Sequence, residues 1–273
     1  MNKSLQETVE MALSEDIGDG DVSSSLLENT LVGAELICRD KAIICGVEYF
    51  NFCFSSLDPE AKVNWKIEEG SEAMPGEVIC TIFGKSQAII TAERTALNFL
   101  QMLSATATQT NYLVNLIKHT KALLLDTRKT IPNLREAQKY AVKCGGGVNH
   151  RMGLYDCVML KENHILSIGS LEKSLEKALL NYPMKPIIVE VESIHQLKAA
   201  LSVKGITRIL CDNFYPSELR EAVKLSRGIY PLEASGGIDE KNIVDYAETG
   251  VDYISIGSIT KDIFSIDLSL NFT

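Results

Sequence analysis

Polar and charged side chains stand at the ends of six short apolar runs in the second half of the sequence: ALLLDT, CVMLK, PIIVEV, RILCDN, PLEASGG and YISIG. The residues at these ends are Thr127, Arg128, Lys129, Lys161, Glu190, Asp212, Ser235, Gly236, Gly237, Ser255, Ile256 and Gly257. Functional groups at the carboxyl ends of successive parallel strands, with glycine-rich loops after the last two, are typical of the active face of a β/α barrel. We therefore expect these residues to share one site.

Positive charge is concentrated in one segment of a chain that is acidic overall. The segment from Asp126 to His164 contains seven lysines and arginines but only four acidic residues, whereas the whole chain has a formal net charge of −9. Such a cluster favours a polyanionic small molecule as ligand, because the cations attract it by field as well as by contact. Arg135, Lys139 and Lys143 repeat every four residues and are interpreted as the solvated face of a helix.

Two motifs in this segment carry the other cations. In DTRKT, Arg128 offers a planar fork suited to a carboxylate, and Lys129 offers a point charge suited to a phosphate. In CGGGVNHR, three glycines allow backbone N–H groups to approach an anion, and His150 and Arg151 follow directly. The glycine run is not a P-loop, because no Lys-Ser/Thr pair follows it. A plain tight turn is the alternative interpretation.

Two carboxylates end predicted strands and should project toward the same mouth as Lys161. They are Glu190 and Asp212. Buried carboxylates need partners, so salt bridges to Lys129 and Lys161 are one interpretation. The other is that they bind ribose hydroxyls or Mg²⁺, or stabilise developing positive charge. Both interpretations are compatible if the salt bridges form in the empty site and a substrate then displaces the lysines.

Composition excludes several classes of protein. The chain has 273 residues, of which 45% are hydrophobic and 23% charged, as in an ordinary globular protein. An acidic chain without a basic tail is a poor nucleic-acid binder, since such binding depends on neutralising phosphates. The N-terminus has no apolar leader, and the uncharged stretch 95–117 is too polar for a membrane. We expect a soluble, cytoplasmic protein with a helix pair over that stretch.

The seven cysteines are scattered and odd in number, and none forms a C-x-x-C pair. Most of them lie inside apolar runs. We therefore predict reduced core thiols of a cytosolic protein, and neither disulfides nor zinc ligands.

Hydrophobic patterning divides the chain into two domains. Short runs broken by glycine and proline fill residues 31–83, with one helix inserted, and indicate an α+β domain over residues 1–107. Beyond it, near-continuous apolar runs alternate with amphipathic segments, which indicates parallel strands buried on both faces. The segment 108–265 is shorter than the about 250 residues of a full barrel, so we expect an open β/α barrel of about six parallel strands. The alternating tail, 266–273, is predicted to return to the first domain as a strand.

The motifs also occur in a fixed order along the chain. DTRKTIPNLREAQKYAVKCGGGVNHRMGLYD is followed by LKENHI, LCDN, LEASGGI and TGVDYISIGSIT, and is preceded by EDIGDGDVSS, a turn at Gly46 and ERTALNFLQ. Over essentially its whole length the sequence resembles the quinolinate phosphoribosyltransferase family. The resemblance implies an N-terminal α/β sandwich domain joined to an open β/α barrel, in dimers or larger assemblies. It also implies conversion of quinolinate and 5-phosphoribosyl-1-pyrophosphate to nicotinate mononucleotide, pyrophosphate and CO₂, with Mg²⁺, in NAD biosynthesis.

The same resemblance assigns roles to residues. The carboxylates of quinolinate would be held by residues of the barrel: Arg128, His150, Arg151 and Lys161. Arg94 would join them from the neighbouring subunit of a homodimer or dimer-based hexamer. The phosphoribosyl pyrophosphate and its Mg²⁺, the metal directly or through water, would be held by Lys129, Glu190 and Asp212. These three and Lys161 would take part in catalysis, Thr127 would line the site, and the loops 235–237 and 255–257 would bind the 5-phosphate.

Arg94 lies far in sequence from every predicted strand end. The uncharged surface after it is expected to pack partly against the partner subunit; it is formed by Leu97, Phe99, Leu100 and Leu103. An intrachain salt bridge to Glu93 or to a nearby acid is the alternative for Arg94.

Other functions fit parts of the pattern. A related enzyme that occurs with molybdate transport genes shares the fold and would act on a different substrate. A Schiff-base aldolase would use Lys161 as an uncharged amine. A purely structural role is the poorest fit, because it does not require six polar strand ends at one mouth.

Overall fold

The computed structural model describes residues 3–273, and the chain divides into two compact units. The first unit contains the chain up to Asn111 together with Ile131–Gly146 and Asp262–Thr273; the second contains Tyr112–Thr130 and Gly147–Lys261. Among the described residues, no helix is both long and apolar enough to cross a membrane. All seven cysteines are free thiols and six are buried, which confirms the prediction of reduced core cysteines.

The first unit is built on an antiparallel sheet with the strand order β12-β1-β5-β3. Its strands are β1 (Leu31–Cys38), β3 (Lys62–Trp65), β5 (Val78–Lys85) and β12 (Leu268–Phe272). A separate two-stranded sheet is formed by β2 (Ala42–Ile43) and β4 (Glu72–Ala73). Because β12 pairs with β1, the end of the chain lies in the sheet of the first unit.

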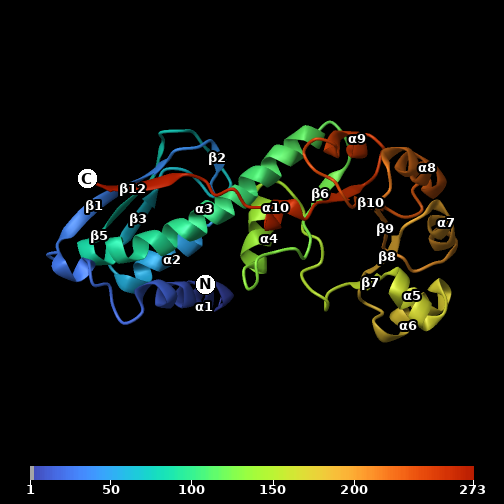
Figure 1. Cartoon of the computed structure of the whole chain (residues 1–273), viewed down its shortest axis with the longest axis horizontal. Coiled ribbons are helices and arrows are strands. Elements are labelled where there is room, and N and C mark those ends of the chain that lie inside the picture. The colour runs from blue at the N-terminus through green and yellow to red at the C-terminus, as the bar shows by residue number, and fades with distance from the viewer. Residues whose placement is uncertain (1–2) are drawn as a thin grey trace. The chain divides into compact units, whose positions relative to one another are not determined.

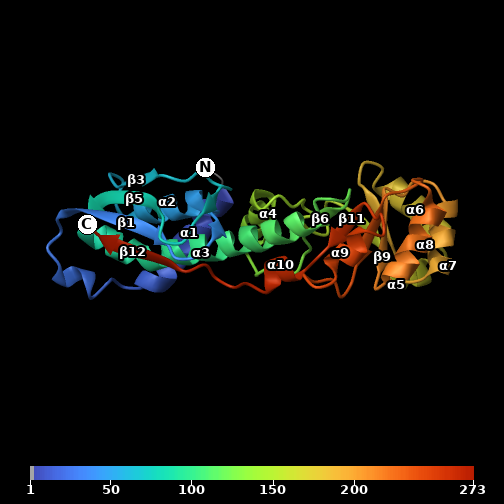
Figure 2. The same ribbon diagram turned by 90° about the horizontal axis from the view of Figure 1, so that it is seen from above.

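Alternation of side chains decides which face of this sheet is buried. Ala34 and Leu36 of β1 are buried, as are their cross-strand partners Ile82 and Cys80. Three helices share an apolar core with this face (Figures 1 and 2): α1 (Lys3–Ile17), α2 (Val47–Leu57) and the first half of α3 (Ser86–Ile117). A 3₁₀ turn at Ser24–Leu26 precedes β1. The unit is therefore a two-layer α/β sandwich.

Helix α3 is a single helix of 32 residues, so the expectation of a helix pair over 95–117 is wrong. Threonine hydroxyls at positions 106, 108 and 110 donate to carbonyl oxygens one turn back, which makes the polar stretch compatible with one helix. Leu97, Phe99, Leu100 and Leu103 are at most 6% exposed and pack in cores of the first unit. The expectation that these four residues face a partner subunit is therefore also wrong.

Helix α4 (Arg135–Cys144) groups with the first unit, although the predicted boundaries placed it in the barrel domain. The physical reason is apolar contact, because Ala137 and Ala141 pack in a core cluster with residues of α3. Lys139 is only 1% exposed. The interpretation of three cations as a solvated helix face is thus wrong for Lys139, whereas Lys143 is exposed.

Close packing explains the first glycine of the triple-glycine run. A Cβ atom on Gly145 would lie 2.3 Å from the carbonyl oxygen of Ala107 and 2.6 Å from Cβ of Thr110, both in α3. Gly146 has a φ of +88°, in the left-handed region that favours glycine. These two residues let α4 lie against α3 and turn the chain, so the tight-turn interpretation holds for them.

We predict that Gly145→Ala lowers the free energy of unfolding by about 1–3 kcal/mol, the usual cost of overpacking. The added methyl group would meet backbone atoms of α3, which cannot rotate away as a side chain would. Chemical denaturation measures the change. Lys143→Ala, at an exposed position of the same helix, is the control and should stay within about 0.5 kcal/mol of the unsubstituted protein. Equal stability of the two variants would contradict the packing argument.

The second unit contains a six-stranded sheet in which all neighbouring strands are parallel, as predicted. Its strands are β6 (Leu123–Leu125), β7 (Val158–Leu160), β8 (Ile187–Val191), β9 (Arg208–Asp212), β10 (Leu232–Ser235) and β11 (Tyr253–Ser255). The strand order is β7-β8-β9-β10-β11-β6. Since β6 and β7 are the two edges, the sheet does not close on itself and the barrel is open.

Short helices connect these strands and lie outside the curved sheet (Figure 1). They are α5 (Glu162–Ile168), α6 (Leu171–Asn181), α7 (Ile194–Ser202), α8 (Pro216–Ser226) and α9 (Ile243–Ala247), while α10 (Ser258–Lys261) follows β11, the last of the six strands. Serine side chains cap two of them, with Ser170 accepting an N–H at the start of α6 and Ser193 at the start of α7. Because every connection returns the chain to the same edge, the carboxyl ends of all six strands meet there.

Candidate active site

Residues two positions apart on a strand point to the same side of the sheet, because strand side chains alternate. On five strands of the open barrel, such pairs consist of an inner residue and a residue at the carboxyl end. The pairs are Met159 and Lys161, Ile188 and Glu190, Leu210 and Asp212, Glu233 and Ser235, and Tyr253 and Ser255. The strand-end members form the rim of a cavity, and Met159, Leu210 and Glu233 form its floor.

The cavity has a volume of about 440 Å³ and lies entirely within the second unit. It is lined by Thr127, Arg128, Lys129, His150, Arg151, Met159, Lys161, Glu190, Leu210, Asp212, Glu233, Ser235 and Ser255. Ten of the residues predicted for the site are among them. Gly236, Gly237, Ile256 and Gly257 lie in the loops directly after β10 and β11, and Arg94 is exposed on α3 of the first unit.

Two glycines in these loops make room for neighbouring groups of the site. A Cβ atom on Gly257 would lie 2.7 Å from Cδ of Lys129 and 3.3 Å from Oγ1 of Thr127. Gly236 has a φ of +96°, and its Cβ atom would overlap the side chain of Asn213. Larger residues at either position would displace the loops that carry the site.

Hydrogen bonds fix the backbone of the DTRKT loop and leave its cations at the cavity. Oγ1 of Thr127 accepts the N–H of Lys129 at 3.0 Å. The hydroxyl of Thr260 donates to the carbonyl oxygen of Lys129 at 2.8 Å. The side chains of Arg128 and Lys129 remain exposed. The loop is therefore held in place while its charges face solvent and ligand.

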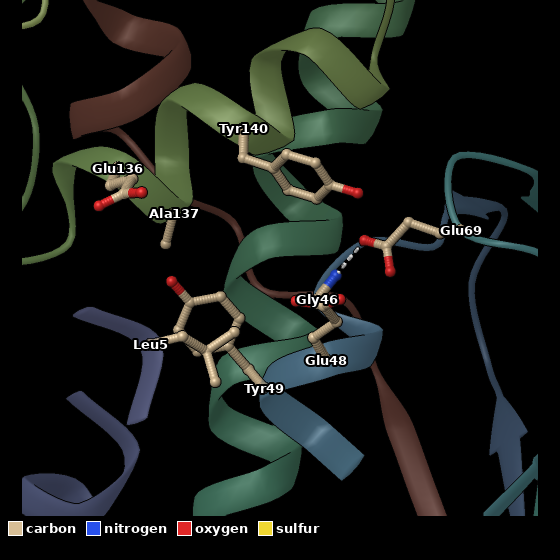
Figure 3. Close-up of a pocket in the computed structure, with 8 residues that line it drawn as sticks. All are labelled: Leu5, Gly46, Glu48, Tyr49, Glu69, Glu136, Ala137 and Tyr140. Atoms are coloured by element: carbon tan, nitrogen blue, oxygen red, sulfur yellow. Dashed lines mark hydrogen bonds between the residues drawn. The ribbon is translucent and has the colours of Figure 1, made fainter. Parts of the chain in front are cut away.

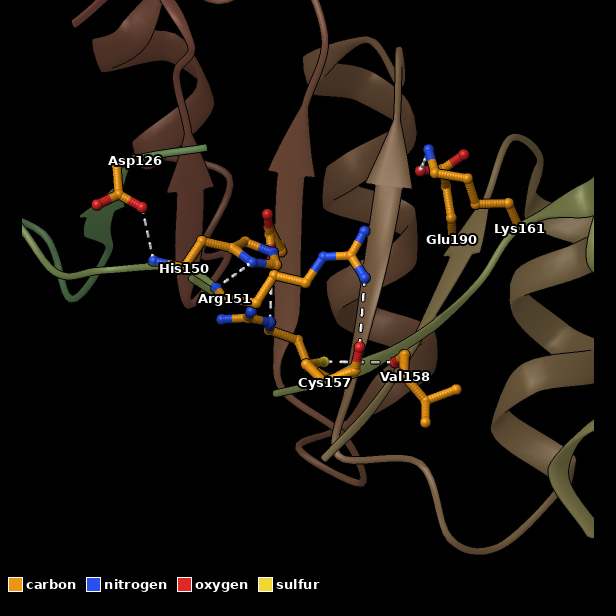
Figure 4. Close-up of polar contacts among 9 residues, drawn as sticks. Asp126, His150, Arg151, Cys157, Val158, Lys161 and Glu190 are labelled. Atoms are coloured by element: carbon orange, nitrogen blue, oxygen red, sulfur yellow. Dashed lines mark hydrogen bonds and ion pairs between the residues drawn. The ribbon is translucent and has the colours of Figure 1, made fainter. Parts of the chain in front are cut away.

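A buried carboxylate positions the segment that carries His150 and Arg151. Asp126 is fully buried, and its Oδ1 accepts the backbone N–H of His150 at 2.8 Å (Figure 4). Its Oδ2 accepts an N–H of the Asn149 side chain at 2.5 Å. Nη1 of Arg151 donates in turn to the carbonyl oxygen of Cys157 at 3.2 Å. Burial, followed by the positive charge of Arg128, lowers the pKa of the Arg151 guanidinium, so two cations are concentrated on this side of the cavity.

The hydrogen bonds of His150 define its tautomer. Nδ1 of the ring accepts the backbone N–H of Arg151 at 2.7 Å, so Nδ1 carries no proton (Figure 4). The proton is therefore on Nε2, which lies 3.5 Å from Oε2 of Glu233. The Nε2–H group of His150 is thus directed at Glu233, and the ring lines the cavity.

Glu233 is a charged residue in the middle of a strand, and sequence analysis missed it. It is fully buried, with Oε2 2.9 Å from Nε of Arg208. Burial opposes ionisation, but the contacts with His150 and Arg208 outweigh it and lower the pKa of Glu233 below its usual value. The guanidinium of Arg208 lies over the ring of Tyr253, 4.8 Å from its centre. The buried ion pair of Glu233 and Arg208 thus supports His150 at the floor of the cavity.

Acidic side chains occupy the opposite side of the rim. Nζ of Lys161 forms an ion pair with Oε2 of Glu190, as one interpretation of the sequence predicted (Figure 4). Glu190, Asp212 and Glu192 each offer a carboxylate oxygen, and these atoms lie within 4.8 Å of one another. Mg²⁺ prefers oxygen ligands, so this set of donors suits the predicted metal. Sequence analysis missed Glu192, although it stands two residues after Glu190 and therefore on the same side of the chain.

The ion pair of Lys161 also bears on the aldolase alternative. Schiff-base formation needs an uncharged amine, whereas pairing with Glu190 stabilises the ammonium form. An open β/α barrel with cations facing carboxylates across one cavity defines an enzyme that acts on small, highly charged anions.

Comparison with known proteins identifies the family within that class. Residues 21–104 match the N-terminal domain of quinolinate phosphoribosyl transferase, and residues 106–271 match its C-terminal domain. This chain belongs to the quinolinate phosphoribosyltransferase family, as the order of its motifs predicted.

Individual relatives are similar to this chain over nearly its whole length. A probable nicotinate-nucleotide pyrophosphorylase (carboxylating) of Bacillus subtilis is 38% identical over 95% of this chain and 90% of its own length. A nicotinate-nucleotide pyrophosphorylase (carboxylating) of Mycobacterium leprae is 35% identical over 97% of this chain and 96% of its own. The solved structure of the nicotinate-nucleotide pyrophosphorylase from Francisella tularensis matches with a TM-score of 0.98 and 44% identity, covering 100% of this chain and 97% of that one.

Proposed function

We propose that this chain converts quinolinate and 5-phosphoribosyl-1-pyrophosphate to nicotinate mononucleotide, pyrophosphate and CO₂, in the de novo synthesis of NAD. The observation that carries the proposal is the cavity in which Arg128, Arg151 and Lys161 face Glu190 and Asp212. The three cationic side chains suit a dicarboxylate, and the two carboxylates suit a metal-bound pyrophosphate with a ribose. The names of the relatives support the same reaction.

Quinolinate is assigned to the cationic side of the cavity. Arg128, Arg151 and Lys161 supply positive charge for its two carboxylates, and His150 lines the same space. Lys161 leaves Glu190 to bind the substrate. Arg94 is assigned to the same site in a partner subunit.

The phosphoribosyl pyrophosphate is assigned to the other side. Lys129 contacts its phosphates, the loops 235–237 and 255–257 offer backbone N–H groups to the 5-phosphate, and Thr127 lines the space between them. Glu190 and Asp212, with Glu192 beside them, would hold Mg²⁺. When bound, the metal neutralises charge on the leaving pyrophosphate.

The chemistry follows from these positions. Breaking the bond between C1 of the ribose and the pyrophosphate oxygen builds positive charge on the ribose, which Glu190 or Asp212 stabilises. The pyridine nitrogen of quinolinate then bonds to C1. The alkylated ring accepts the electron pair of the adjacent carbon–carboxylate bond as CO₂ leaves, and a proton is then added to that carbon. Lys161 and Lys129 are placed to assist these last steps.

Turnover tests the proposal directly. The protein is mixed with quinolinate, phosphoribosyl pyrophosphate and Mg²⁺, and CO₂ and nicotinate mononucleotide are measured. Nicotinate is the matched control, because it offers one carboxylate to a site built for two. Each charge-assisted hydrogen bond lost with the second carboxylate costs about 1.5–3 kcal/mol, so kcat/KM for nicotinate should be lower by at least about tenfold. Comparable values for the two acids, or turnover of neither, would overturn the proposal.

Lys129→Ala is predicted to weaken binding of phosphoribosyl pyrophosphate more than binding of quinolinate. One charge-assisted contact is worth about 1.5–3 kcal/mol, which corresponds to roughly a 10- to 150-fold rise in Kd. Titration of each ligand separately, followed by calorimetry, gives both values. Lys198→Ala, at an exposed position of α7, is the control and should change neither. A selective loss of quinolinate binding would reverse the assignment of Lys129.

The assembly belongs to the same proposal. The active species is a cytoplasmic homodimer, alone or within a hexamer, in which α3 of one subunit contributes Arg94 to the partner. Its support is that Arg94 is exposed on α3 and, in the described part of the chain, is not among the residues that line the cavity.

A further inference from the structure

Two cysteines and a glutamate come together in the first unit, away from the cavity of the barrel. One ligand atom from each of Cys45, Cys144 and Glu69 lies within 4.8 Å of the others. Cys45 follows β2, Glu69 precedes β4, and Cys144 is the last residue of α4. The spacing of the cysteines in the sequence gave no sign of this cluster, and the prediction that no cysteine is a zinc ligand rested on that spacing.

The three residues are held rigidly. The backbone N–H of Cys45 donates to Oγ of Ser104 at 2.9 Å, and the same hydroxyl donates to the carbonyl oxygen of Cys45 at 3.2 Å. The carboxylate of Glu69 accepts the N–H groups of Gly46 at 2.7 Å and Val47 at 3.0 Å (Figure 3). Cys144 is followed by Gly145, which is packed tightly against α3. Preorganised donors of this kind reduce the cost of binding a ligand.

A cavity of about 190 Å³ borders the cluster at Glu69. Its lining residues are Leu5, Gly46, Glu48, Tyr49, Glu69, Glu136, Ala137 and Tyr140 (Figure 3). Within the described part of the chain, three glutamates and no lysine or arginine line it. The hydroxyl of Tyr140 points toward Glu69, and Tyr140 stands one helical turn before Cys144. The negative lining attracts cations to this side of Glu69.

The two thiols also contact each other, because a hydrogen bond joins Cys45 and Cys144. A bound cation would replace the protons of both thiols and take two thiolates as ligands.

We propose that Cys45, Cys144 and Glu69 form a binding site for a thiophilic divalent cation of the zinc class. Two thiolates and a carboxylate are ligands that Zn²⁺ accepts in tetrahedral sites, whereas Mg²⁺ favours oxygen donors alone. Water or the hydroxyl of Tyr140 completes the tetrahedron. The cation ties the turn after β2 to the end of α4 and so stabilises the first unit. This site is separate from the carboxylates of the barrel.

The test titrates the reduced full-length protein with Co²⁺, which reports thiolate ligands through charge-transfer absorption, and then displaces it with Zn²⁺. One equivalent of Co²⁺ should produce the absorption, Zn²⁺ should remove it, and Tm should rise with Zn²⁺. Cys144→Ala and Glu69→Gln should both weaken Co²⁺ binding. Cys144→Ala should raise the Kd for Co²⁺ by more than about 10- to 100-fold, which is the loss typical of removing an outer-sphere partner. Excess Mg²⁺ should not compete.

Cys53→Ala is the matched control, because this buried cysteine lies in α2 outside the cluster and should leave Co²⁺ binding unchanged. Circular dichroism of each variant separates lost binding from lost folding; if Cys144→Ala does not fold, Cys144→Ser replaces it. Absence of charge-transfer absorption in the reduced, folded protein would overturn the proposal. The proposal would also be overturned if the absorption persists in a folded Cys45→Ser/Cys144→Ser protein. The same holds if an air-formed disulfide is the only product.

Discussion

Replacing Glu233 with alanine is expected to destabilise the protein by about 3–5 kcal/mol, the cost of removing one partner from a buried ion pair. The carboxylate of Glu233 lies 2.9 Å from Nε of Arg208, and both residues are largely shielded from water. Without Glu233, the guanidinium of Arg208 keeps its contact with the ring of Tyr253 but loses its carboxylate partner. His150 loses its support at the same time, so kcat/KM should fall by about 10- to 100-fold, as when outer-sphere partners are removed from other sites.

Two further variants separate stability from positioning. In Glu233→Leu/Arg208→Leu both charges are replaced by apolar groups, which restores stability but not the support of His150. The free energy of unfolding of the double variant should therefore be close to that of the unsubstituted protein, whereas its kcat/KM should remain low. Glu176→Ala removes an exposed carboxylate of α6 and is the control for both measurements. Full activity in the double variant would show that Glu233 serves stability alone.

The tautomer of His150 gives an independent readout. The chain has four histidines, so the nitrogen-15 signals of labelled imidazoles can be assigned by substitution. His150 should carry its proton on Nε2 in the unsubstituted protein and lose this fixed state in Glu233→Ala. A proton on Nδ1 would be incompatible with the bond from the N–H of Arg151.

The rim of the site was predictable from the sequence, whereas its floor was not. Lys161, Glu190 and Asp212 stand where apolar runs end, and parallel strands bring such ends to one edge whatever their exact register. Glu233 lies inside the apolar run PLEASGG, which was interpreted as a strand, and so Glu233 was not predicted as a site residue. The available signal was its distance of two residues from Ser235, which places both on the same side of β10. Its partner Arg208 lies on another strand, and only the pairing of β9 with β10 brings the two together.

Other features depended on contacts between distant segments, which sequence patterns do not record. Lys139 has the spacing of a solvated residue and is buried because α4 lies against α3. Cys45 and Cys144 come from different elements and meet only in the folded unit. Gly145 looks like part of an anion-binding run, but the approach of two helices requires it. Local patterns therefore identified the elements and strand ends, and packing decided the rest.

Mixing two inactive variants, Arg94→Ala and Lys161→Ala, is expected to restore activity to at most about a quarter of the unsubstituted level. Arg94 is exposed on α3, and within residues 3–273 it forms no salt bridge, although it is near enough to Glu93 for its charge to oppose the rise that burial causes in the pKa of that carboxyl. If Arg94 serves the partner's site, a mixed dimer contains one site with an intact barrel and an intact Arg94.

The size of the recovery follows from random pairing. Equal amounts of two exchanging chains give mixed dimers in about half of the population, and each mixed dimer has one intact site of two. Each variant incubated alone under the same exchange conditions is the control and should stay inactive. If Arg94 instead acts within its own chain, every site in the mixture lacks either Arg94 or Lys161, and mixing restores nothing. Recovery therefore requires both a contribution across the interface and the dimer as the smallest active unit.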